Sequence, residues 1–428
     1  MSVVALSPEA AELAIPEGRI VSGARVRGMG IFLLLLSVVM FGPLGFSVPA
    51  HLKATFLLNA PPAFSVQPLI MTVRSVVVPL AVLCALLGAV LIVRTRGRGS
   101  YALFSLGVVA FLWAFLVWVG RGSQLNFVDL LSESLAYSTP LLYGSMSGIM
   151  CERSGVVNIA IEGQFLAGAF LAAMISSATG SLWLGVLGGA VAGGLFGALL
   201  AFLALRYGAD QIIVGVVIVA FCTGLTNFLT EQVLTPHENL NQGATFSAFG
   251  IPLVDKIPVI GPALFNQNWF FYGAIVLLIL LNIGLFKTRW GLRSRAVSEH
   301  PRAAETVGIH VLSVRYRSVV LGGVVAGIGG AWFTVGNVGE FVAGMSSGLG
   351  YVALAVMIFG RWRPFGALSA ALLFGFSTAL PSFLAVLNVD IPSDFLSMAP
   401  YLVTIAVVAG LVGRVRAPAA DGVPYSRE

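Results

Sequence analysis

Residues 71–93 read MTVRSVVVPLAVLCALLGAVLIV, an apolar run whose one charged side chain is Arg74. A helix of about 20 apolar residues spans the hydrocarbon core of a bilayer. The whole chain of 428 residues shares this character, with 58% hydrophobic residues, 10% charged residues and a mean hydropathy of +0.95. Soluble domains carry about 25% charged residues. The composition therefore predicts an all-α integral membrane protein.

Eleven further apolar runs flank this one, so we expect about 12 membrane segments. The runs that begin near residues 158 and 347 are short or interrupted, and we expect some of the helices to be broken. The twelve runs lie near residues 30–48, 71–93, 101–120, 129–150, 158–177, 182–205, 211–232, 269–286, 318–336, 347–360, 366–386 and 397–413.

Basic residues follow every second predicted span and so mark one side of the membrane. Cytoplasmic loops carry an excess of lysine and arginine, so this side is predicted to be cytoplasmic, with both termini on it. The opposite side holds only Lys53, Arg121 and Lys256. The cytoplasmic set comprises Arg19, Arg25, Arg27, Arg94, Arg96, Arg98, Arg206, the cations between Lys287 and Arg317, Arg361, Arg363, Arg414 and Arg416.

A polar break at residues 121–126 divides the predicted spans into two blocks. Residues 29–121 form an appended block of three spans, and residues 126–413 form a transport core that includes a charged cytoplasmic loop at 287–317. Short cytoplasmic tails at 1–28 and 414–428 complete the predicted organisation.

Residues 151–164, CERSGVVNIAIEGQ, place charged and amide groups inside an apolar region. Polar groups at membrane depth are costly unless they face protein or a water-filled cavity. Asn158 and Glu162 are spaced i, i+4 and could share one face of a broken helix that lines a polar path. The alternative is a cytoplasmic turn in which Glu152 and Arg153 are solvated and Asn158 caps the next helix. The residue types leave both interpretations open.

Residues 291–309, GLRSRAVSEHPRAAETVGI, are the most charged part of the predicted cytoplasmic loop. Ser298 suits a helix N-cap and Pro301 a first turn, and Gly308 suits the end of a short helix. Such a helix could dock on another protein. The alternative is an ordinary basic loop that only sets the topology.

No pattern in the chain indicates catalysis. No lysine follows a Gly-x-x-x-x-Gly phosphate loop, the four histidines lack metal-ligand spacing, and no nucleophile elbow is present. We therefore expect neither an enzyme nor a cofactor-binding or nucleic-acid-binding chain.

Four stretches together resemble the ribose/branched-chain amino-acid class of ABC permeases, and within it the nucleoside-type permeases that work with a basic-membrane-protein lipoprotein. They occur in order and cover the predicted transport core. The stretches are ERSGVVNIAIEGQ at 152–164 with LAGAF at 166–170, RAVSEHPRAAETVGI at 295–309, ALAVMIFGRWRPFG at 353–366 and PYLVT at 400–404.

The resemblance implies a translocation subunit in the bacterial cytoplasmic membrane that takes up nucleosides. A binding lipoprotein would deliver the substrate, and a separate ATPase would bind and hydrolyse ATP. A second permease, a different chain, would complete the pore, and no nucleic acid would take part. The outer loop 234–268, with Asp390 and Asp394, is the expected docking site of the lipoprotein. The implied substrate path comprises Asn158, Glu162, Gln164 and Asn227. The implied ATPase contact comprises Glu299, His300, Pro301, Ala303, Ala304, Glu305 and Gly308.

Several alternatives remain. A simple sugar or a branched-chain amino acid could replace the nucleoside, because relatives often carry an arginine where this chain has Leu349. An ion-coupled secondary transporter would also use broken helices, although it would usually bury more ionisable groups in its spans. Asn227 could equally be a polar contact between helices.

Overall fold

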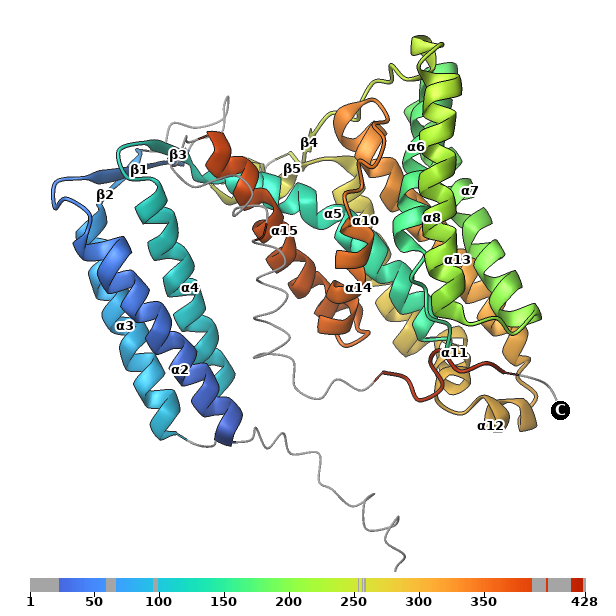
Figure 1. The fold of residues 1–428 in the computed structure, drawn as a ribbon, viewed down its shortest axis with the longest axis horizontal. Helices are drawn as coiled ribbons and strands as arrows, with labels where there is room; N and C mark the ends of the chain where they lie inside the picture. The colour runs from blue at the N-terminus through green and yellow to red at the C-terminus, as the bar shows by residue number, and fades with distance from the viewer. Residues whose placement is uncertain are drawn as a thin grey trace, which may run out of the picture. The chain divides into compact units, whose positions relative to one another are not determined.

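The computed structural model describes residues 23–58, 67–94, 99–252, 254–255, 257, 259–386, 398 and 417–425 (Figure 1). Within these residues, nine helical stretches are long and apolar enough to cross a membrane. The chain is therefore a mostly helical membrane protein, as its composition predicted. The predicted span 129–150 is the more polar helix α5 (Phe127–Glu152), the span 347–360 is the shorter helix α14 (Leu349–Phe359), and 397–413 falls almost wholly outside the described residues.

The chain divides into two compact units. The first comprises Met1–Phe56 and Leu69–Leu125, and the second comprises Leu57–Pro68 and Asn126–Glu428.

The first unit is a bundle of three helical stretches joined by a small sheet. Gly30 and Gly88 bring two of its helices into backbone contact, since a Cβ at Gly30 would lie 2.7 Å from the carbonyl oxygen of Gly88. The sheet has the strand order β2-β1-β3, and Lys53 pairs antiparallel with Thr72. Its elements are α2 (Gly23–Val39) continuing into η1 (Met40–Phe46), β1 (Lys53–Leu57), β2 (Leu69–Thr72), α3 (Val73–Val93), α4 (Ser100–Val119) and β3 (Gln124–Asn126).

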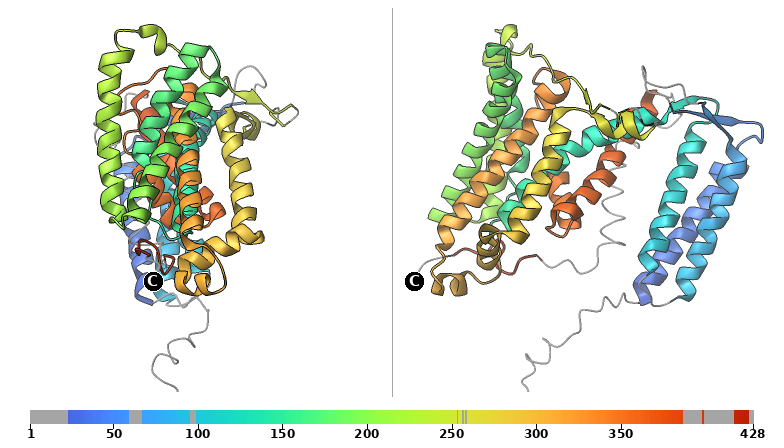
Figure 2. Two further views of the ribbon diagram at one scale, coloured as in Figure 1. Left: turned by 90° about the vertical axis from the view of Figure 1, so that its right-hand side faces the viewer. Right: turned by 180° about the vertical axis from the view of Figure 1, so that it is seen from behind.

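The second unit is a helical bundle through which α5 runs (Figures 1 and 2). Helix α5 contacts α10, α13, α14 and α15, whereas α6 contacts α7, α8 and α13. Besides α5 and α14, the elements are α6 (Ile161–Thr179), α7 (Leu182–Ala201), η2 (Phe202–Arg206), α8 (Gln211–Leu229), η3 (Thr230–Leu234), η4 (Glu238–Leu240), β4 (Phe249–Gly250), α9 (Ile260–Phe265), β5 (Asn266–Gln267), α10 (Trp269–Lys287), α11 (Arg289–Glu299), α12 (Pro301–Thr306), α13 (Val311–Phe333), η5 (Thr334–Val338) and α15 (Pro364–Val386).

Side-chain caps begin several of these helices. The Asn126 side chain accepts hydrogen bonds from the backbone at the start of α5, and Asp210 does the same for α8. Asn268 and Thr288 cap α10 and α11. Such caps satisfy N–H groups that have no partner inside the helix. They fix where each apolar run becomes a helix.

Glycines let α6, α7 and α13 approach at the level of their backbones. A Cβ at Gly193 of α7 would lie 2.2 Å from the carbonyl oxygen of Gly323, and one at Gly327 of α13 would lie 2.1 Å from that of Gly189. A Cβ at Gly168 of α6 would also meet the backbone of Gly327, at 2.5 Å. Small residues at this spacing are how membrane helices associate without a hydrophobic driving force.

Candidate functional site: a cavity beside a broken helix

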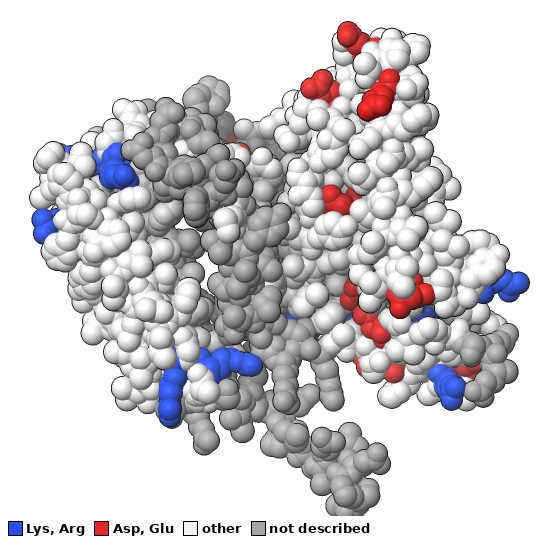
Figure 3. Space-filling view, in the orientation of Figure 1, with Lys and Arg blue, Asp and Glu red and all other residues white. Residues whose placement is uncertain are grey.

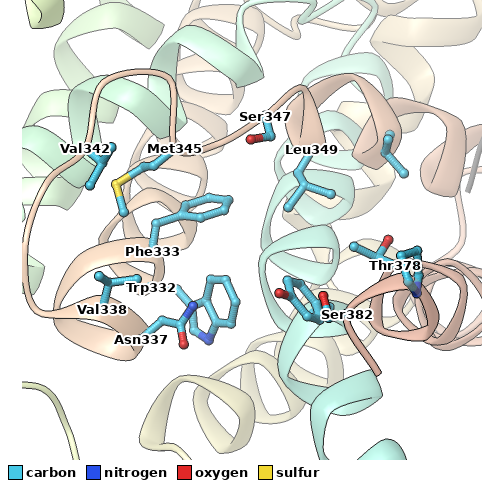
Figure 4. A pocket seen from close by; sticks show the side chains of 13 residues that line it. Trp332, Phe333, Asn337, Val338, Val342, Met345, Ser347, Leu349, Thr378 and Ser382 are labelled. Carbon is cyan, nitrogen blue, oxygen red and sulfur yellow. The ribbon is translucent and has the colours of Figure 1, made fainter. Parts of the chain in front are cut away.

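A cavity of about 500 Å³ lies within the second unit, between α5, α13, α14 and α15 (Figure 4). This volume is within the range of roughly 300 to 1,000 Å³ that small-molecule sites occupy. Figure 4 shows Phe333 and Met345 on one side and Leu349, Thr378 and Ser382 across from them. The described lining residues are Tyr137, Trp332, Phe333, Asn337, Val338, Val342, Met345, Ser347, Leu349, Val352, Thr378, Pro381 and Ser382.

A long non-helical segment forms one wall of this cavity. Helix α13 ends at Phe333, passes into the π-helical turn η5, and the chain then returns to α14 without regular structure. Gly339, Gly344 and Gly348 adopt positive φ angles of 91°, 71° and 80° along this segment, a region that residues with a Cβ rarely occupy. Non-helical backbone at membrane depth is tolerated where it is enclosed by protein or lines a cavity.

Glu162 holds the end of this segment in place. One carboxylate oxygen accepts hydrogen bonds from the Ser346 hydroxyl at 2.6 Å and the Gly348 N–H at 2.9 Å. The other accepts from the Gly350 N–H at 2.7 Å. A Cβ at Gly350 would lie 2.5 Å from the Glu162 Cα, so only glycine permits this approach. The negative charge lies at the N-terminus of α14, where a helix dipole favours it.

The cavity lining is aromatic and polar, but carries no formal charge among its described residues. The rings of Tyr137 and Trp332 are 6.3 Å apart, and those of Trp332 and Phe333 are 5.2 Å apart in an edge-to-face arrangement. Asn337, Ser347, Thr378 and Ser382 supply amide and hydroxyl groups. This combination suits a neutral solute that has a flat apolar part and several hydroxyl groups.

None of the four predicted path residues lines this cavity. Asn158 is fully buried in the irregular turn before α6, so it does not share a helical face with Glu162 as we expected. Its Nδ2 donates to Gln164 Oε1 at 3.1 Å and to Ser147 Oγ at 3.3 Å. The Asn158 Oδ1 and Gln164 Nε2 atoms have no hydrogen-bond partner. Asn227 is exposed on α8 and does not reach the cavity.

The cavity aromatics are not among the site residues that the sequence predicts. Only the margin of the cavity is indicated, by the interruption near 347 and by Leu349, where relatives often carry an arginine. Trp332, Phe333 and Asn337 sit at the end of the predicted span 318–336, where polar residues and glycine break the apolar pattern. That break was the available signal.

The predicted docking segment forms two helices joined by a bend. Helix α12 begins at Pro301 with His300 as its N-cap, whereas Ser298, which we expected to be the N-cap, is a buried residue near the end of α11. Gly308 has a positive φ of 83° and follows the end of α12, as expected. Ala303 is exposed and Val307 is 74% exposed, whereas Ala304 is buried and Glu305 is half-buried. Glu299 is the last residue of α11.

The outer predicted loop, 234–268, contains η4, α9 and the antiparallel pair of strands β4 and β5, in which Phe249 pairs with Gln267. Asp390 and Asp394 lie outside the described residues. Within the described residues, no group of three or more His, Cys, Asp or Glu side chains could hold a metal ion.

Comparison with known proteins assigns the second unit. The family described as the branched-chain amino acid transport system permease component matches residues 130–415. This chain is a member of that permease family. The match covers the cavity, the Glu162 contacts and the docking helices, and it confirms the resemblance found in the sequence. The permease is accordingly a multi-pass protein of the cytoplasmic membrane.

Curated relatives include two permeases with named substrates. A nucleoside ABC transporter permease protein of Lactococcus lactis is 40% identical over 309 residues, which is 69% of this chain and 96% of that protein. A guanosine ABC transporter permease protein of Bacillus subtilis is 37% identical over 316 residues, which is 70% of this chain and 98% of that protein. A glucose ABC transporter permease protein of Haloferax volcanii is 26% identical over 243 residues, covering 54% of this chain and 63% of that protein. The comparison with solved structures gave no significant match.

Proposed function

We propose that this permease is the translocation subunit of an ATP-driven importer for nucleosides, and that the solute passes through the cavity described above. The observation that carries the proposal is the uncharged, aromatic and hydroxyl-bearing lining of that cavity. Stacking between a base and an aromatic side chain contributes about 1–3 kcal/mol, whichever base is present. The names of the nucleoside and guanosine relatives support the same substrate class.

The cavity chemistry also separates the competing substrates. A branched-chain amino acid carries an ammonium and a carboxylate, and burying such charges without partners is costly. The described lining offers no charged partner. A sugar is neutral and remains a candidate on this criterion, and the glucose relative gives it some support. A nucleoside base can stack on the aromatic side chains of the lining, which a sugar ring does less extensively. We therefore propose nucleosides rather than sugars as the substrate.

The direct test is uptake by the assembled importer in proteoliposomes with internal ATP. We expect a labelled nucleoside to be taken up, and unlabelled nucleosides to compete where glucose, leucine and nucleoside monophosphates do not. Phe333→Ala removes one stacking surface and should weaken apparent affinity by about 5- to 150-fold, the equivalent of 1–3 kcal/mol. Competition by glucose but not by nucleosides would make the sugar the substrate.

Two serines on α15 provide a matched pair for this test. Both serines are exposed, but Ser382 lines the cavity, whereas Ser369 lies outside the lining and its hydroxyl donates to the Gly366 carbonyl oxygen of its own helix. We expect Ser382→Ala to weaken nucleoside uptake and Ser369→Ala to leave it unchanged. Equal effects of the two substitutions would remove the cavity from the transport path.

We also propose that the second unit places α11 and α12 on the cytoplasmic side, together with both termini, and that the full chain has about twelve membrane segments. Basic residues cluster at the turns of this end, including Arg153, Arg206, Arg361 and Arg363. On the face that Figure 3 shows, acidic groups lie at both ends of the unit, but the described Lys and Arg lie only at this end. The positive-inside rule orients the unit by that difference in basic residues. A fluorescent protein fused after Glu428 should fold and fluoresce, whereas one inserted after Gly122 should not.

ATP hydrolysis is assigned to a separate ATPase subunit that docks on α12, and this chain is proposed to have no catalytic or cofactor role of its own. The exposed Ala303 and Val307 form an apolar knob at this end of the bundle. Val307→Asp should prevent co-purification of the ATPase in mild detergent.

A second permease and a substrate-binding lipoprotein on the loop 234–268 complete the proposed complex, and both should co-purify with the unaltered chain.

A further inference from the structure

The C-terminal segment 417–425 lies against the docking helices. Its Ala420 N–H donates to the Ser298 carbonyl oxygen at 2.8 Å, and the Ala419 N–H donates to Glu299 at 3.4 Å. The Tyr425 hydroxyl donates to the Glu305 carboxylate. Figure 2 shows this dark red segment beside α11 and α12. The segment therefore contacts both acidic residues of the docking region, Glu299 and Glu305.

A fully buried arginine donates two hydrogen bonds to the same segment. Arg315, near the start of α13, donates from Nη1 to the Val423 carbonyl oxygen at 2.9 Å and from Nη2 to that of Ala420 at 3.4 Å. The turn between α5 and α6 closes over this contact. Gly155 has a φ of 87° there, and a Cβ would lie 2.8 Å from Arg315 Nη2. The Arg315 guanidinium group therefore packs tightly between the turn and the C-terminal segment, which leaves no room for a side chain at Gly155.

The segment also reaches the end of α5 through two acidic side chains. The carboxyl group of Asp421 lies beside that of Glu152 and interacts with it electrostatically. The Trp362 indole N–H donates to the Glu152 carboxyl group at 2.5 Å. Trp362 lies in the turn between α14 and α15, and its carbonyl oxygen accepts from Arg153 Nε at 3.1 Å. One buried cluster thus joins the tail to α5, α14 and α15.

Both connected helices line the cavity further along their length. Glu152 ends the continuous helix α5, which carries Tyr137 into the cavity wall. The turn at Trp362 follows α14, which contributes Leu349 and Val352. A displacement of α12 can therefore reach the cavity through Tyr425, the tail and Glu152.

We propose that residues 417–425 act as a tie that transmits movement of the ATPase from α12 to the cavity, with Tyr425 and Asp421 as its positioning residues. This inference rests on the proposed function. The docking helices also reach the end of α5 at a separate polar contact, in which the Ser294 hydroxyl of α11 donates to the Arg153 carbonyl oxygen at 3.0 Å. The tie adds a polar connection from Glu305 of α12 itself, through Tyr425 and the C-terminal segment, to the buried cluster at the end of α5.

The charged and titratable groups around the tie are compatible with this role. Glu152 and Arg315 face Asp421, while Glu305 and Arg315 face Tyr425. Arg153, Arg295 and Arg363 lie near Glu299 and the turn. Burial raises the pKa of Asp421 to about 6, against the opposing effects of Glu152 and Arg315. Because burial of the Asp421 carboxylate costs free energy, the other contacts of the segment must offset that cost.

The test measures the cavity in a way that does not depend on the substrate. All three native cysteines are buried, so Ser382→Cys provides a single reactive thiol in the cavity wall. Its rate of maleimide labelling is measured in the assembled complex without nucleotide and after trapping with ATP and vanadate. We expect the two rates to differ in this parent. Tyr425→Phe should shrink the difference by about 2- to 30-fold, the range seen for residues within coupling networks, while ATP hydrolysis persists.

Matched variants separate transmission from folding. Glu305→Gln keeps an acceptor for the Tyr425 hydroxyl and should keep the response, whereas Glu305→Leu should lose it. Because Glu305 also lies on α12, ATPase co-purification is measured for both variants and should be retained. Val423→Ala keeps the carbonyl that Arg315 binds and should behave as the parent. Because Tyr425 and Glu305 contact each other, combining Tyr425→Phe with Glu305→Leu should add little to either alone.

Each outcome bears on one claim. A full nucleotide response in Tyr425→Phe and Glu305→Leu overturns the tie and leaves the proposed function intact. Parallel loss of ATPase co-purification and ATP hydrolysis would mean that the tail is merely structural, which also overturns it. Absence of a nucleotide response in the parent would refute the proposed function, and the tie with it.

Discussion

Glu162 is the residue whose contacts define the cavity wall, since its carboxylate accepts three hydrogen bonds from Ser346, Gly348 and Gly350. Glu162→Ala would leave these buried donors without acceptors, which costs about 1–3 kcal/mol for each unsatisfied group. We expect a fall in Tm of roughly 2–10 °C for the purified protein and loss of nucleoside uptake. Glu162→Gln keeps an acceptor and should be intermediate.

The control for this prediction is Glu231→Ala, because Glu231 is exposed in η3. It should leave Tm and uptake unchanged. Unchanged uptake and Tm in Glu162→Ala would show that the contacts at the start of α14 are dispensable.

At the level of single residues, the sequence identified which side chains are unusual but not what they contact. The polar groups of 158–164 are buried, as the cost of polar groups at membrane depth predicts. Their partners are Ser147, Gln164 and the start of α14, which lies nearly two hundred residues away in the chain for Glu162. Spacing along a helix carries no information on such distant contacts.

Among the elements, the glycine contact of α7 with α13 tolerates the least change. In Gly327→Val the first added carbon would lie 2.1 Å from the Gly189 carbonyl oxygen. Overpacking typically costs about 1–3 kcal/mol, and here a rigid backbone opposes it. We expect loss of the monodisperse peak in size-exclusion chromatography. Gly224→Ala on α8, where a Cβ meets nothing within 4 Å, should elute as the unaltered protein, and equal behaviour of the two would refute the prediction.

The C-terminal segment should bind the docking helices in a pH-dependent manner. The pKa of Asp421 is raised to about 6 by burial in the docked segment. The docked state therefore holds this proton more tightly than a released tail, so docking is strongest below the ordinary pKa of aspartate. It weakens as pH rises to about 6 and then levels off.

Hydrogen exchange of the Ala420 amide, which donates to Ser298, measures this effect. After correction for intrinsic exchange, protection should fall with rising pH by at most about tenfold per pH unit, the limit for one proton. Asp421→Asn, compared at each pH, should abolish this dependence. A dependence that persists in Asp421→Asn would assign it to another group, such as Glu152.

Helices that correspond to continuous apolar runs were predictable from the sequence. The backbone conformation of segments that interrupt such runs was not. Helices α3, α7 and α10 coincide closely with the runs near 71–93, 182–205 and 269–286. The segment between Val338 and Leu349 carries Glu340, two serines and three glycines, and these glycines adopt left-handed conformations that keep it irregular. Hydropathy reports the depth of a segment in the membrane but not its backbone conformation.

For the whole molecule, the family match covers the second unit and not the first. The nucleoside relative is matched over 96% of its length by 69% of this chain, and the family match begins at residue 130. The first unit, through Leu125, lies outside that match. We expect the second unit to fold and function by itself.

A chain in which residues 1–125 are replaced by a cleavable signal peptide tests this expectation, because the signal delivers Asn126 to the same side of the membrane. ATPase co-purification should be retained, and nucleoside uptake should stay within about twofold of the full chain. Failure to assemble, with normal insertion, would make the first unit part of the working core.

The glycine contacts of α6, α7 and α13 have a mechanical consequence for an alternating-access cycle. Where backbones touch directly, no side chain can change rotamer to absorb sliding, and close-packed interfaces shift between discrete arrangements rather than deform. These three helices should therefore travel as a rigid slab. Opening and closing then belongs to the far wall of the cavity at α15, because the start of α14 is itself held against α6 at Gly350 and Glu162.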